Sequence, residues 1–128
     1  GDDKGSGECA MDRESHAHTI TGMKIDINRK SFVLANKTGG VSGPAIHPIA
    51  VRMVYEAANA VDLPIIGMGG IMTAEDAIEM ILAGASAVSV GTANFHNPSV
   101  TMDIVDGIEA YMKAQGFETV ADMVGIVK

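Results

Sequence analysis

Two short apolar runs, each followed by glycine and separated by one helical segment, constrain the fold of this chain most. The runs at 63–67 and 87–90 have the length and composition of strands that are buried on both faces of a sheet. Between them, Thr73 stands three residues before Asp76 in a variant of the capping box that begins a helix, and Gly84 is placed to end that helix. Strand–helix–strand order with short connections predicts a parallel sheet of the α/β class.

Other elements flank this unit. Residues 24–27 and 31–34 predict a β-hairpin, because 28–30 suit a turn, and residues 38–44 form a glycine-rich stretch that we expect to be a loop. Pro44 suits the first turn of a helix that runs to about Ala60. Apolar spacing predicts two more helices, one from the pattern of Ile104, Val105, Ile108, Tyr111 and Met112, and one from that of Val120, Met123, Val124 and Val127.

The composition limits the classes of partner. The formal net charge of -7 argues against nucleic acid and anionic membrane surfaces, both of which need clustered Lys and Arg. No apolar run approaches the roughly 20 residues of a membrane span. Cys9 is the only cysteine, so a reducing cytoplasm is the expected setting. Residues 1–18 are polar and lack periodicity, so we interpret them as a flexible lead-in, tag or junction.

The glycines after the two strands predict a site. Gly67 to Gly70 and Gly91-Thr92 follow adjacent parallel strands, and their backbone amides can form a nest for an anion. The chain has no Lys or Arg between Arg52 and Lys113, so a phosphate here would rest on amides, on the Thr92 hydroxyl and on helix amino-termini. Glu75 and Asp76 would compete with an anion near the first turn, which favours the second. The alternative is that these glycines only make tight turns.

Three segments, ANKTGGVSGPAI, LPIIGMGGIMTAEDAIEMILAGASAVSVGTANF and TGMKID, resemble dihydroorotate dehydrogenase, and the resemblance covers Thr19 to about Lys128. TGGVSGPAIHPIA and VGTA resemble the NAD-linked class most. The resemblance implies the carboxy-terminal half of a (β/α)8 barrel with a β-hairpin insertion, since a complete barrel takes about 250 residues. Residues 19–128 would then be a half-barrel that carries an FMN phosphate site.

The resemblance also implies roles for individual residues. Gly43 matches the glycine of the SGP loop that contacts FMN. Gly69 and Gly70 match the pair at the FMN phosphate, and Gly91 and Thr92 match the second phosphate turn. Thr19 matches a threonine that binds the orotate ring. Cys9 does not match the surroundings of the family's catalytic cysteine, so no catalytic residue is assigned.

The resemblance implies an oxidoreductase of pyrimidine (UMP) biosynthesis, in which FMN takes a hydride from dihydroorotate and a separate iron–sulfur and FAD subunit passes electrons to NAD. We expect this chain alone to be inactive and to form homo-oligomers. Three alternatives stay open: a non-catalytic, self-associating half-barrel scaffold, a fragment like the matching domain of dihydropyrimidine dehydrogenase, and another phosphate-binding barrel.

The histidines predict little chemistry. His16 and His18 form a His-x-His pair, but zinc usually needs a third or fourth ligand, so we predict no metal site. His47 is expected on the surface of the first helix, and His96 is expected to be a plain loop residue.

Overall fold

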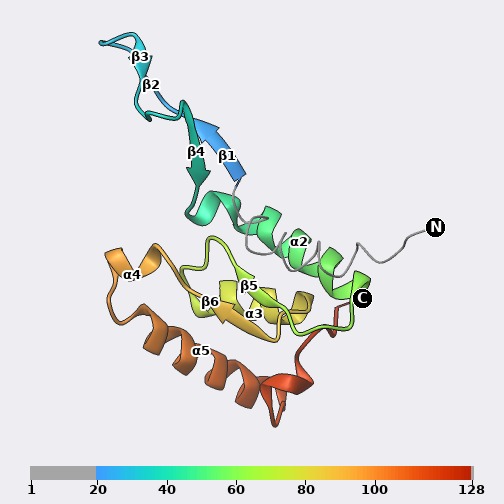
Figure 1. The fold of residues 1–128 in the computed structure, drawn as a ribbon. Helices are drawn as coiled ribbons and strands as arrows, with labels where there is room; N and C mark the ends of the chain where they lie inside the picture. Colours follow the sequence, from blue (N-terminus) through green and yellow to red (C-terminus); the bar gives the residue numbers. More distant parts are fainter. Residues whose placement is uncertain (1–19, 128) are drawn as a thin grey trace, which may run out of the picture.

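The computed structural model describes residues 20–127, which form a projecting β-hairpin and a layered α/β body (Figure 1). The hairpin pairs β1 (Ile20–Met23) with β4 (Thr38–Val41), and β2 (Ile25–Asp26) with β3 (Ser31–Phe32), both antiparallel. The predicted hairpin is therefore confirmed, with its turn between β2 and β3. The expectation of a loop throughout 38–44 is wrong, because Thr38–Val41 pairs along the whole of β1.

The body follows the hairpin. Its elements are η1 (Pro44–Ile46), α2 (His47–Ala60), β5 (Ile66–Met68), α3 (Ala74–Ala83), β6 (Ala87–Ser89), α4 (Ala93–His96), α5 (Val100–Gln115) and η2 (Val120–Asp122). Strands β5 and β6 are parallel neighbours, as predicted. Helix α3 connects them and contacts both α2 and α5. No helix within residues 20–127 is long and apolar enough to cross a membrane.

The core lies between the helices and one face of the β5–β6 sheet. Its centre holds small and medium apolar side chains, among them Ala50, Val54, Ile65, Ile71, Ala77, Met80 and Ile104. The expectation that the first strand is buried on both faces is wrong, because Ile66 is 54% exposed while Ile65 is 2% exposed. Within the described residues, helices cover only one face of this two-stranded sheet (Figure 1).

The ends of α3 match their sequence signals. Thr73 and Asp76 form a complete capping box, and Gly84 is the C-cap with a φ of 134°. A Cβ on Gly84 would lie 2.3 Å from the Ala58 Cβ, so α2 packs closely on the end of α3.

The prediction of a last helix, over residues 120–127, is wrong. Only a single 3-10 turn, η2, forms there. The backbone after η2 forms hydrogen bonds with the end of α3 instead. The Gly125 amide donates to the Ile81 carbonyl, and the Val127 amide donates to the Leu82 carbonyl. These bonds join the segment after η2 to the last turn of α3, where the Ile81 carbonyl also accepts from the Gly84 amide, while Met123 becomes fully buried. Gly125, at a φ of 67°, ends the turn.

Candidate functional site

A cavity of about 290 Å³ opens where the loops after β4, β5 and β6 meet. Its lining comprises Gly40, Val41, Ser42, Gly43, Ile46, Met68, Gly69, Gly70, Ile71, Ser89, Gly91 and Thr92. All five residues that sequence analysis assigned to a cofactor and that lie in the described part of the chain are in this set. The cavity therefore joins three separate segments of sequence into one site.

Parallel pairing brings the two glycine turns together. Met68 pairs with Ser89 at the carboxyl ends of β5 and β6, so both chains leave the sheet side by side. The amides of Gly70, Ile71, Gly91 and Thr92 find no hydrogen-bond acceptor among residues 20–127. Such unpaired donors beside a cavity are suited to an anion.

The loop that contains Gly43 reaches the first turn through direct backbone packing. Gly70 has a φ of 66°, and a Cβ added there would lie 2.6 Å from the Gly43 carbonyl oxygen. By contrast, Cβ atoms added at Gly43 or Gly91 would meet nothing within 4 Å. The cavity is thus tightly built at Gly70 and open at Gly43 and Gly91.

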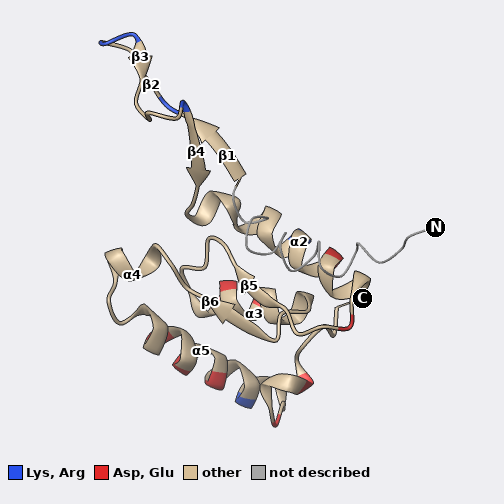
Figure 2. Ribbon diagram, viewed as in Figure 1, with Lys and Arg blue, Asp and Glu red and all other residues tan. Residues whose placement is uncertain are grey.

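The electrostatics of the cavity are set by the backbone. None of its lining residues is charged. The Lys and Arg residues of the described chain lie mainly on the hairpin, as Figure 2 shows, at Lys24, Arg29, Lys30 and Lys37. A bound phosphate would therefore meet amides and hydroxyls without a basic side chain, as the sequence predicts.

The expected competition from acidic residues does not arise at the cavity, since neither Glu75 nor Asp76 lines it. Glu75 is exposed, and the Asp76 Oδ2 accepts hydrogen bonds from the amides of Met72 at 2.9 Å and Thr73 at 3.1 Å. The Asp76 carboxylate caps its own helix in this way.

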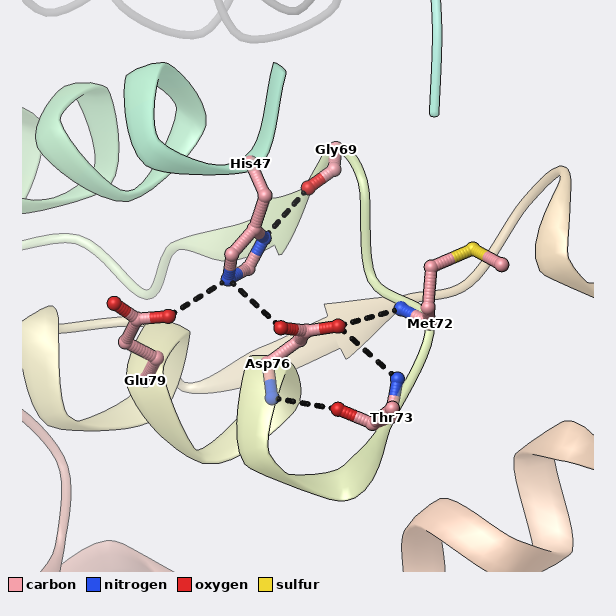
Figure 3. A network of polar contacts seen from close by, with 6 residues as sticks. All are labelled: His47, Gly69, Met72, Thr73, Asp76 and Glu79. Carbon is pink, nitrogen blue, oxygen red and sulfur yellow. Dashed lines mark hydrogen bonds and ion pairs between the residues drawn. The ribbon is translucent and has the colours of Figure 1, made fainter. Parts of the chain in front are cut away.

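The expectation that His47 lies on the surface is wrong, since this residue is only 6% exposed. Figure 3 shows its ring between the first glycine turn and α3. The ring Nδ1 lies 2.9 Å from the Gly69 carbonyl oxygen, and Nε2 lies 3.0 Å from Glu79 Oε2 and 3.7 Å from Asp76 Oδ1. These three side chains place ligand atoms within 4.8 Å of one another. The 3.0 Å contact between Nε2 and Oε2 is the length of a direct hydrogen bond.

Comparison with known proteins identifies the family. The family model described as dihydroorotate dehydrogenase matches residues 5–112. This chain belongs to that family. It is 60% identical over 117 residues to the dihydroorotate dehydrogenase B (NAD(+)) catalytic subunit of Lachnoclostridium phytofermentans, covering 91% of this chain and 39% of that protein. The catalytic subunit of the same name from Alkaliphilus metalliredigens is 58% identical over 108 residues, which cover 84% of this chain and 36% of that protein.

A solved dihydroorotate dehydrogenase has a similar fold. The crystal structure of the Eimeria tenella enzyme in complex with ferulenol superposes with a TM-score of 0.69 at 27% identity, covering 91% of this chain and 33% of that chain. The resemblance inferred from TGGVSGPAI, GMGG and VGTA is therefore confirmed at the level of the family, whose members are oxidoreductases. The chain spans about two fifths of the length of the curated relatives.

Some predicted residues lie elsewhere. Thr19, Cys9, His16 and His18 lie outside the described residues. His96 is exposed at the end of α4 and does not line the cavity. Sequence reasoning missed His47, although a signal exists: His47, Ala50 and Val54 are the buried residues of α2, and they follow the helical spacing i, i+3, i+7.

Proposed function

We propose that this chain supplies the FMN phosphate cradle and part of the substrate site of an NAD-linked dihydroorotate dehydrogenase, as the carboxy-terminal half of its (β/α)8 barrel. One observation carries the proposal: Gly43, Gly69, Gly70, Gly91 and Thr92, assigned from three distant motifs, line a single cavity. The relatives named as NAD(+)-linked catalytic subunits support the class.

The residues present fit a flavin phosphate. A Cβ at Gly91 would project into empty space beside the cavity, so the backbone can approach a ligand closely there. We assign the phosphate to the amides of Gly70, Gly91 and Thr92 and to the Thr92 hydroxyl, and the flavin side to the Gly43 loop. Bound FMN would supply the acceptor for a hydride from dihydroorotate.

Substrate and partner belong to the same proposal. Thr19 would contact the pyrimidine ring, and an iron–sulfur and FAD subunit would take electrons onward to NAD. Because residues 20–127 contain no cysteine, we propose that the proton acceptor lies outside them and that this chain alone does not oxidise dihydroorotate.

The test compares FMN with riboflavin, which lacks the phosphate. Titration of the purified chain, followed by flavin fluorescence, should give tighter binding of FMN, with weak dependence on salt because no basic side chain lines the cavity. Orotate should then shift the spectrum of the bound flavin. Equal affinity for riboflavin, or no binding of FMN, would refute the phosphate cradle, and a missing orotate shift would favour a phosphate-binding barrel of another kind.

Variants sharpen this test. Gly91→Val should preserve the thermal unfolding midpoint, since nothing lies within 4 Å of an added Cβ, but should weaken FMN binding at least tenfold by filling the cavity. Ala114→Val, at an exposed position on α5, serves as the matched control. Equal FMN affinity in both variants would contradict the assignment of Gly91.

A second candidate function is a self-associating scaffold. The exposed apolar residues Leu63, which precedes β5, and Ile66, which lies in β5, favour it, since their exposed fractions are 49% and 54%. This candidate does not exclude FMN binding, and it would be supported if the chain associated but did not bind flavin.

A further inference from the structure

His47 connects the cavity to the body of the protein, although it does not line the cavity. Among the described residues it is the only buried residue that is polar or charged. It begins α2, four residues after Gly43, and its ring faces the turn after β5 (Figure 3). A buried polar ring has a high desolvation cost unless both nitrogens have partners, and here both have them.

The partners fix where the hydrogens are. The Gly69 carbonyl can only accept, so Nδ1 must carry hydrogen and donate to it across 2.9 Å. The ionised Glu79 carboxylate also only accepts, so Nε2 donates to Glu79 Oε2 across 3.0 Å. With both bonds made, the ring bridges the turn and α3.

The bond to Gly69 is one of several restraints on this glycine turn. Gly69 and Gly70 have φ values of 125° and 66°, and a glycine backbone changes readily between such conformations and others. The amide of Gly70 has no acceptor within residues 20–127. Packing against Gly43 and His47 adds a restraint, since a Cβ on Gly70 would lie 2.6 Å from the Gly43 carbonyl oxygen and 2.9 Å from the His47 backbone nitrogen.

Asp76 restrains the other side of the same turn. Its Oδ2 accepts from the amides of Met72 and Thr73, and its Oδ1 lies 3.7 Å from His47 Nε2. The segment from Gly69 to Thr73 is thus tied at both ends to one polar network.

We propose that His47 is a positioning residue: its Nδ1 hydrogen bond holds the Gly69–Gly70 turn in the conformation that presents amides to the cavity before any ligand arrives. The inference rests on the proposed function only for the identity of the ligand, a flavin phosphate. Preorganised amides bind an anion more tightly than mobile ones, because binding does not then have to order them.

Two substitutions separate the two ring contacts. Asn places its amide nitrogen as many bonds from Cβ as His Nδ1, and Gln places its own as far as Nε2. His47→Asn therefore preserves a donor to Gly69, whereas His47→Gln preserves one to Glu79. Glu79→Gln, like His47→Asn, should leave the Gly69 bond intact, and Glu56→Gln, an exposed glutamate on α2, is its matched control.

The first readout needs no ligand. Backbone ¹⁵N relaxation should give order parameters of about 0.85 for Gly69 and Gly70 in the wild-type chain, and values below ~0.6 in His47→Gln. His47→Asn and Glu79→Gln should remain close to the wild type. Equal effects of Asn and Gln at position 47, or no effect of either, would overturn the proposal.

If His47→Gln does not fold, the His47 ring of the wild-type chain provides the test. Its ¹⁵N spectrum should show a protonated Nδ1, and an unprotonated Nδ1 would overturn the proposal.

The second readout is flavin affinity, measured by fluorescence. His47→Gln should weaken FMN binding about three- to tenfold, the range expected for one hydrogen bond, while His47→Asn stays within about twofold. Absence of FMN binding in the wild type would refute the proposed function, yet the order parameters would still test the role of His47. FMN affinity that is unchanged in a His47→Gln chain with a mobile turn would refute preorganisation.

Discussion

Replacing Gly70 with alanine tests whether the cavity depends on the close approach of two loops. The new methyl group would lie 2.6 Å from the Gly43 carbonyl oxygen, 2.8 Å from the His47 Cβ and 2.9 Å from the His47 nitrogen. Two of these atoms belong to the backbone and cannot rotate away. The left-handed conformation adds a cost of about 1–2 kcal/mol for a residue with a Cβ, and overpacking adds about 1–3 kcal/mol. We therefore expect a destabilisation of about 2–5 kcal/mol, a large part of the stability of a typical domain.

Urea unfolding followed by circular dichroism measures this change, with Gly91→Ala as the control. An added Cβ at Gly91 meets nothing within 4 Å, so that variant should stay within about 0.5 kcal/mol of the wild type. If Gly70→Ala were as stable as Gly91→Ala, the two loops would not be in contact as described, and the argument for a single cradle would fail.

Three further outcomes are expected. Gly107→Ala should lower the thermal unfolding midpoint, because the added Cβ would lie 2.2 Å from the Ala74 Cβ at the α3–α5 contact. The overpacking costs about 1–3 kcal/mol, against a helix-propensity gain of about 1 kcal/mol. A raised midpoint would contradict this packing. Thr73→Ala should lower the free energy of unfolding by about 1 kcal/mol, because it removes the cap of α3. Urea unfolding measures this loss, with Thr101→Ala as the control. Equal losses of stability in the two variants would show that the cap contributes nothing. Sizing with light scattering should show self-association through the face around Ile66, and a monodisperse monomer would exclude it.

The sequence predicts the local architecture well where a short pattern determines it. The Thr73–Asp76 capping box, the C-cap at Gly84 and the parallel pairing of β5 with β6 all follow from local signals and are present. The glycine turns meet because adjacent parallel strands must end at one edge, so two loops of the cavity could be expected to be neighbours from topology alone.

Two of the errors have a shared cause, which is tertiary contact. Residues 120–127 have helical spacing, but the amides of Gly125 and Val127 donate to the carbonyls of Ile81 and Leu82 at the end of α3, and only one turn forms. His47 is polar at the start of a helix, where exposure is the usual outcome, yet Gly69 and Glu79, which are distant in sequence, supply the partners that allow burial. No local pattern contains those partners.

Because no basic side chain lines the cavity, binding of an anion there would depend on how firmly the Gly69–Gly70 turn is held. Each backbone dipole contributes about 0.3–1 kcal/mol to an anion, so several amides must point to one place at once. A lysine can follow a displaced phosphate, but an amide in a glycine turn can do so only if the turn moves. Tight binding therefore requires a rigid turn, and three restraints provide it: the His47 bond to Gly69, the packing of Gly70 on Gly43, and the Asp76 cap that follows. The glycines permit the shape of the site, and the polar network beneath them keeps that shape in place.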